Sequence, residues 1–172
     1  MRIVAVVGLV CLSLPAFGAP QASERQTVLI GPWTISTTHH ADKFVSCSMN
    51  RSASDMEITF VKKQDGLLLM LDSPKWKLER GKTYTVKLLA GPRAAEAKAL
   101  AEKTGVTIAF ADGALNDRLR TANVLEIRGE GATLRVPLDK SATAFDRLES
   151  CFERNIRESP ETNPFVAPTR KP

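Results

Sequence analysis

The sequence predicts one α+β domain, mainly antiparallel β, with about seven to nine strands in a sandwich or a strongly curled sheet. Three observations support this fold class. Apolar and polar residues alternate along most of the chain, turn-forming residues separate the short alternating runs, and two segments have a helical pattern instead. The domain is predicted to span residues 19–156, a length suited to a single hydrophobic core.

Residues 1–18 have the layout of a secretory signal peptide. Arg2 precedes an uninterrupted apolar run at residues 3–14, and a proline and small residues follow that run. The run is too short to cross a bilayer as a helix, and no later segment predicts a membrane span. We expect cleavage near Gly18 and a mature protein that is periplasmic or secreted, although the exact cleavage position stays open.

Alternation of period two begins at Trp33 and predicts the first strands. A turn at Asp65 and Gly66 separates the third of these strands from the fourth. Leu67–Leu71 is apolar at every position, which predicts a strand covered on both faces. The predicted strands of this half are Trp33–Ser36, Phe44–Met49, Met56–Val61 and Leu67–Leu71.

A second hairpin is predicted from Trp76 to Leu88, with its turn at Gly81. Trp76 and Leu78 alternate with charged residues, which places Trp76 in the core rather than on an exposed surface. The cluster Lys75, Trp76 and Lys77 is nevertheless the one place where basic residues flank an aromatic ring, so these three residues are a candidate binding site.

Composition and periodicity disagree over residues 94–103. The segment is rich in Ala, Glu, Lys and Leu, which favour a helix. The alanines, however, fall on strict alternation, which favours a strand that would pair with Val106–Phe110. The alternation makes the strand the preferred interpretation, and the helix stays open as the alternative.

The last third of the chain predicts a helix, a hairpin and a closing helix. Ala114–Thr121 has a helical stripe, and Val124–Arg128 and Thr133–Leu138 form a tight hairpin. Ser141–Arg154 is predicted as an amphipathic helix with its N-cap at Thr143. Residues 157–172 contain four prolines and few apolar residues, which predicts a disordered tail.

Two cysteines remain after removal of the signal peptide, Cys47 in an early strand and Cys151 on the apolar face of the closing helix. An even count in an exported protein favours a disulfide, and metal binding would require further ligands. We therefore predict a Cys47–Cys151 bond that joins the last helix to the sheet.

The side chains with catalytic potential are few. His39, His40 and Asp42 form a polar cluster, and we expect a turn between strands there rather than a metal or catalytic site. Neighbouring histidines on a strand point to opposite faces, so they do not easily share an ion. No phosphate-binding glycine loop is found. The sequence therefore predicts no catalytic residue, no metal and no cofactor.

The charge is mildly basic, with a net charge of +5 that falls to +4 without Arg2. Most of the basic residues are expected to be solvated side chains at strand edges and turns, with an anionic surface as the alternative partner. Nucleic-acid binding is not expected, because basic residues are not interleaved with several exposed aromatic rings.

Three segments together resemble small, uncharacterised periplasmic proteins of alphaproteobacteria. These are the cysteine strand Phe44–Cys47, the motif W-x-L-x-x-G-x-x-Y at Trp76–Tyr84, and the ending Leu138–Cys151 with an aromatic residue, a leucine and a cysteine three apart. The resemblance covers most of the mature chain but supplies no active site.

A second, fainter resemblance is to invasion-associated locus B proteins. It rests on Trp33 followed by Cys47 and Met49. Those proteins usually have another cysteine close behind the tryptophan, where this chain has Ser36 and Thr37.

Two hypotheses about function follow. The first is a non-enzymatic periplasmic or secreted accessory protein of the cell envelope that binds a protein, a peptide or a cell-wall component through a sheet face or edge. The alternative is a small envelope hydrolase that uses His39 and His40. The absence of a recognisable catalytic set in the sequence favours the first.

Overall fold

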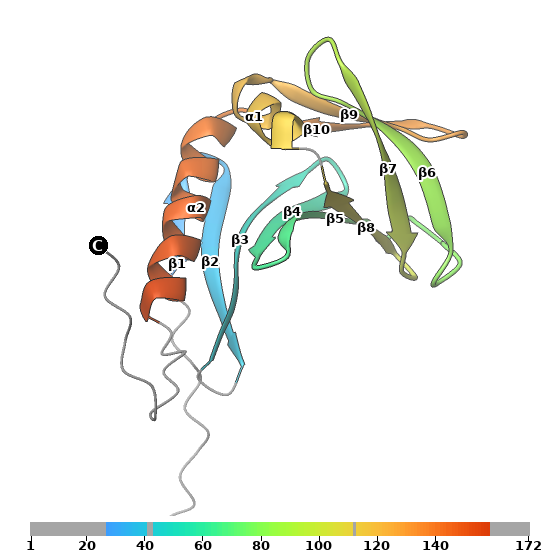
Figure 1. The fold of residues 1–172 in the computed structure, drawn as a ribbon. Helices are drawn as coiled ribbons and strands as arrows, with labels where there is room; N and C mark the ends of the chain where they lie inside the picture. Colours follow the sequence, from blue (N-terminus) through green and yellow to red (C-terminus); the bar gives the residue numbers. More distant parts are fainter. Residues whose placement is uncertain (1–26, 41–42, 112, 159–172) are drawn as a thin grey trace, which may run out of the picture.

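The computed structural model describes residues 27–40, 43–111 and 113–158, and the ordered elements form one antiparallel sheet of ten strands with two helices (Figure 1). The sheet order is β1-β2-β3-β4-β5-β8-β7-β6-β9-β10. The strands are β1 (Thr27–Ile30), β2 (Trp33–His40), β3 (Lys43–Ala53), β4 (Met56–Lys63), β5 (Gly66–Asp72), β6 (Thr83–Leu89), β7 (Ala94–Ala101), β8 (Gly105–Phe110), β9 (Val124–Arg128) and β10 (Thr133–Pro137), and the helices are α1 (Gly113–Thr121) and α2 (Ser141–Glu158).

The sheet curls until its first strands reach the segment that follows β10. β2 and β10 are far apart in the strand order, yet the indole N–H of Trp33 donates a hydrogen bond of 2.9 Å to the carbonyl oxygen of Asp139. Arg51 at the end of β3 donates one of 2.7 Å to the Asp139 carboxylate, and its guanidinium lies 5.3 Å from the centre of the Trp33 ring. The strongly curled sheet is therefore the correct alternative, and a two-sheet sandwich is not formed.

The core lies on the sheet face that carries Trp33, Cys47, Phe60 and Leu69, which we call the inner face. These side chains are fully buried. Helix α2 runs along β2, β3 and β4 on this face, and α1 packs against α2 and β8 (Figure 1). The predicted disulfide between Cys47 and Cys151 is confirmed, and it fixes α2 to β3 across 104 residues.

Several sequence predictions are confirmed by this arrangement. Residues 94–101 form the strand β7, which pairs with β8 as expected. The Val124–Arg128 hairpin has the predicted register, with Leu134 opposite Ile127. Helix α1 buries Leu115 and Leu119.

The predicted count of seven to nine strands is wrong, because the sheet has ten. The extra strand β1 is a short edge strand, and its side chains are only exposed or half-buried. Such a strand shows little of the alternation that marks a buried face.

The prediction that Leu67–Leu71 is covered on both faces is also wrong. Leu67, Leu69 and Leu71 are buried on the inner face, but Met70 points to the outer face and is 45% exposed. β5 pairs with β4 and β8 through antiparallel ladders, and antiparallel sheets commonly leave one face solvated.

The first arm of the predicted second hairpin is not a strand. Residues 73–82 form turns and irregular structure, and only the return arm, β6, belongs to the sheet. The closing helix begins at Ser141 as predicted and continues to Glu158, so Thr143 lies inside the helix and the prediction that it is the N-cap is wrong. Within the described ranges, no helix is long and apolar enough to span a membrane. The predicted signal peptide, residues 1–18, and residues 159–172 of the predicted tail lie outside the described residues.

Candidate functional site

A groove of about 680 Å³ opens on the inner face at the end of the sheet that the helices do not cover. Ligand sites are typically concave and mostly apolar, and this volume lies in their usual range. Its floor and walls come from the 73–82 loop, from β6, β7 and β8, and from the β9–β10 turn. The apolar lining consists of Trp76, Leu78, Tyr84, Val86, Ala99, Val106, Ile108, Ile127, Ala132 and Leu134.

The loop 73–82 forms one wall because its backbone is tied to the β7–β8 turn. The amide of Ser73 donates to the carbonyl of Thr104 at 2.9 Å, that of Leu78 to Lys103 at 3.0 Å, and that of Gly81 to Ala101 at 2.8 Å. These bonds hold the loop alongside the sheet without making it a strand. The apolar wall is thereby fixed by these backbone contacts together with the packing of Trp76 against the core.

The predicted binding cluster divides between this wall and the solvent. Trp76 is half-buried and lines the groove, so it is neither a fully buried core residue nor a free stacking platform. Lys75 and Lys77 are exposed, and Lys75 forms an ion pair with Asp55. Only the aromatic member of the predicted cluster therefore belongs to the groove.

The opposite wall lies where β9 stops pairing with β6, a point that we call the fork. β6 pairs with β7 along its whole length, from Thr83 to Leu89, but pairs with β9 only over Lys87–Leu89. β9 ends at Arg128, where the turn closes with a hydrogen bond of 3.0 Å from the Gly129 amide to the Ala132 carbonyl. The first four residues of β6, Thr83–Val86, therefore have no partner strand on the β9 side, and all four line the groove.

Small side chains on β7 make room for the groove floor. Ala99 lies opposite Tyr84 on β6 and opposite Ile108 on β8, so one methyl group separates two large side chains. Ala97 lies opposite Val86 in the same way. The row of alanines detected in the sequence therefore packs against bulky neighbours.

Charged groups are confined to the rim of the groove. Lys82 lies 5.6 Å from the centre of the Tyr84 ring and forms an ion pair of 3.2 Å with Glu79. Glu130 is exposed in the β9–β10 turn. Just below the turn, a hydrogen bond of 2.8 Å from Arg128 holds the pKa of the Glu126 carboxyl below its usual range. An apolar floor with a polar rim suits a ligand that carries both kinds of group.

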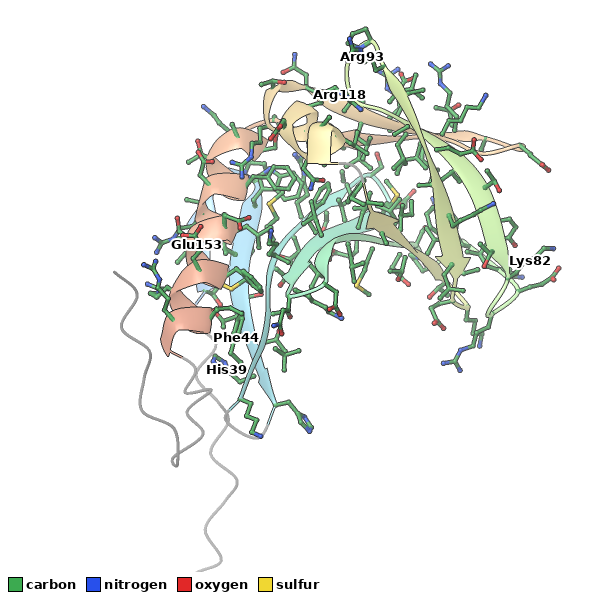
Figure 2. The ribbon with its side chains drawn as sticks, in the orientation of Figure 1. His39, Phe44, Lys82, Arg93, Arg118 and Glu153 are labelled. Carbon is green, nitrogen blue, oxygen red and sulfur yellow. A yellow bond between two sulfur atoms is a disulfide. The ribbon has the colours of Figure 1, made fainter. Side chains whose placement is uncertain are left out.

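The two histidines lie on β2, far from the groove in the strand order, and Figure 2 shows His39 at the end of that strand. β2, which carries them, is separated from β6 by β3, β4, β5, β8 and β7. Both are exposed, and the His39 ring packs edge-on against Phe44 with 6.0 Å between ring centres. Asp42 lies outside the described residues. Among the residues with described positions, no three His, Cys, Asp or Glu side chains are grouped as metal ligands.

Sequence reasoning missed most of the groove. Tyr84, Leu78 and the β9–β10 turn carry no sequence pattern that marks them as binding residues. The W-x-L-x-x-G-x-x-Y motif carries the available signal, because its tryptophan, leucine and tyrosine all line the groove. By itself the motif indicates structure only, and the register of β6 against β9, which opens the fork, is not visible in sequence.

No protein-family model and no curated protein matches the chain. Among solved structures, the crystal structure of invasion associated protein B from Bartonella henselae has a similar fold. The TM-score is 0.51 and the sequence identity is 22%, over 73% of this chain and 97% of that chain. The likeness to invasion-associated locus B proteins, the fainter of the two resemblances in the sequence, is therefore confirmed for the fold.

Proposed function

We propose that the protein is a non-enzymatic accessory protein of the cell envelope, periplasmic or secreted, that binds its ligand in the groove beside Trp76 and Tyr84. The observation that carries this proposal is the groove itself. Its apolar lining is left open at the end of the sheet, although the same inner face is tightly covered by α2 at the other end. Apolar surface left uncovered in a concave site often marks a place where a partner binds.

The disulfide supports an exported location. A buried disulfide closes a loop of 104 residues, and such bonds persist in oxidising compartments. The predicted signal peptide agrees with this, and a protein described as invasion associated shares the fold. A role at the envelope is the function that combines the disulfide, the predicted signal peptide and this likeness.

Site-specific photo-crosslinking tests the proposal. A photoreactive phenylalanine replaces Leu78 in the groove or, as the matched control, Val45, which is 42% exposed on β3. The full chain is expressed in its native envelope, illuminated and analysed by mass. We expect an adduct from position 78 that disappears when Trp76→Ala is added, and no such adduct from position 45.

Two results would overturn the proposal. One is that positions 78 and 45 give the same adducts, or that neither position gives an adduct. The other is turnover by the purified protein on a panel of hydrolase substrates that is abolished by His39→Ala with His40→Ala, since that outcome would favour the envelope hydrolase.

A further inference from the structure

The fork between β6 and β9 exposes backbone as well as side chains. The carbonyl of Lys82, the residue before β6, accepts a hydrogen bond of 2.8 Å from the Ala101 amide and therefore points toward β7, while the Lys82 amide donates to the Glu79 carbonyl in the preceding turn. The backbone groups of successive residues in a strand point alternately to the two sides. The amides and carbonyls of Thr83 and Thr85 therefore point toward the groove, beyond the point where the β9 ladder stops at Lys87.

We infer that this edge takes up an extended acidic peptide as an added antiparallel strand, a proposal that rests on the binding function of the groove. Thr83 and Thr85 offer two amides and two carbonyls at strand spacing. Strand addition to such an edge supplies main-chain hydrogen bonds, and adjacent pockets select alternate side chains of the peptide. Every other strand pair in the sheet is antiparallel, which sets the orientation of the added strand.

The inward side chains of such a peptide are expected to be apolar. Tyr84 and Val86 point to the inner face, where Val86 is buried and Tyr84 half-buried. The peptide residues that follow the same alternation would enter the groove against Trp76 and Ile127. Aliphatic side chains such as valine suit this lining.

The outward side chains are expected to be acidic. Thr85 lies opposite Lys98 on the outer face, and the ammonium group of Lys98 donates to the Thr85 hydroxyl at 2.6 Å. Lys87 and Arg128 lie opposite each other at the fork, but each already has an acidic neighbour, since Glu96 lies opposite Lys87 and Arg128 donates to Glu126. A carboxylate opposite Thr85 on the added strand would therefore have Lys98 as its nearest cation on the outer face.

The charge of the surrounding segment agrees with that choice. Between Lys75 and Lys103 the chain has eight basic and three acidic residues, an excess equal to the net charge of +5 of the whole sequence. This segment builds the loop wall, β6 and β7. Charge complementarity of this kind increases the rate of association and selects between partners.

Binding of the blocked peptide Ac-Glu-Val-Glu-Val-Glu-NH2 to the purified mature protein tests the inference, by calorimetry and by tryptophan fluorescence. In an antiparallel pair, the glutamates lie opposite Thr83 and Thr85 and direct their amides to β6, while the valine amides point away. N-methylation of the two glutamates that lie opposite Thr83 and Thr85 should therefore weaken binding about tenfold or more. N-methylation of the two valines should leave the affinity unchanged. The two modified peptides have the same composition.

Protein variants give a second comparison. Lys98→Glu should weaken binding of the glutamate peptide about tenfold and favour Ac-Lys-Val-Lys-Val-Lys-NH2 instead, while Lys43→Glu at the far end of the sheet should change neither. The fluorescence change should disappear in Trp76→Phe, because Trp33 is fully buried. No saturable binding at millimolar peptide, equal binding of the two N-methylated peptides, or equal binding of the lysine peptide by the unmodified protein would overturn the inference.

These outcomes separate the inference from the function proposed above. A groove adduct identified in the cell as a lipid or a glycan would overturn the peptide and leave the binding function intact. Peptide binding in solution without any groove adduct in the cell would overturn the proposed function and leave the strand-addition chemistry intact.

Discussion

Trp33 and Asp139, which are 106 residues apart, are joined by a hydrogen bond of 2.9 Å from the indole N–H to the backbone carbonyl. The bond connects the start of β2 with the segment that leads from β10 into α2. The Trp33 side chain is fully buried and also packs on Phe60, with 5.9 Å between ring centres. One side chain thus closes the curl of the sheet by packing and by hydrogen bonding at once.

Trp33→Phe should lower the free energy of unfolding by about 1 to 3 kcal/mol, because it removes the hydrogen bond and leaves a small cavity. Urea titration followed by circular dichroism measures the change. Trp76→Phe is the matched control and should change the stability by less than about 0.5 kcal/mol, since Trp76 is only half-buried at the groove. Equal losses from the two variants would contradict the role given to Trp33.

The disulfide should contribute a large part of the stability. Loop closure over 104 residues corresponds to roughly 4 to 5 kcal/mol on the chain-entropy model. We expect Cys47→Ala with Cys151→Ala to lose about that much in urea titration. Added reductant should destabilise the unmodified protein to the same level and leave the double variant unchanged. A loss below about 1 kcal/mol would show that α2 is held by packing alone.

Most strands could be predicted from the sequence because each has one buried face, and alternation reports burial. The loop 73–82 shows the limit of that signal. Trp76 and Leu78 are half-buried between exposed charged residues, as in a strand, yet the Trp76 amide donates to Ser73 and the Leu78 amide to Lys103 in the β7–β8 turn. Periodicity shows which side chains are buried, but it does not show which segment the backbone forms hydrogen bonds with.

The groove could not be predicted for a related reason. It exists because β9 pairs with β6 only over Lys87–Leu89 and ends at Arg128, where the chain turns toward β10. The end of β9 is visible in the sequence, but its register against β6, a strand about forty residues away, is not. The contact at the start of α2 is a similar case, since the Ser141 hydroxyl donates to the Leu119 carbonyl at 2.9 Å, a distant partner that no capping motif indicates.

The Arg51–Asp139 contact predicts an acid-dependent part of the stability. The hydrogen bond from Arg51 holds the pKa of the Asp139 carboxyl below its usual range. Because the folded-state pKa is lower than the unfolded one, the contribution is complete above about pH 4 and is lost as the pH falls through the folded-state value. The effect should be small, because the Asp139 side chain is 59% exposed.

Asp139→Asn should therefore be less stable than the unmodified protein at pH 7, and the difference should shrink as the pH falls below about 4. Urea titrations across this range, at low and at high salt, measure the difference. High salt should reduce it at pH 7, because exposed ion pairs are screened. A difference that grows as the pH falls would have the wrong sign and would contradict the assignment.

Leu69 and Met70 provide a direct test of which face of the sheet is covered. They are neighbours on β5, but Leu69 is fully buried between Phe60 and Ile108, whereas Met70 is 45% exposed on the outer face between Thr59 and Thr107. Leu69→Ala should cost about 2 to 5 kcal/mol through lost burial and a cavity, while Met70→Thr should cost less than about 1 kcal/mol, since threonine suits a solvated strand. Urea titration of the two variants checks the ratio. Comparable losses would mean that the outer face of β5 is covered, as the uniformly apolar sequence of Leu67–Leu71 had predicted.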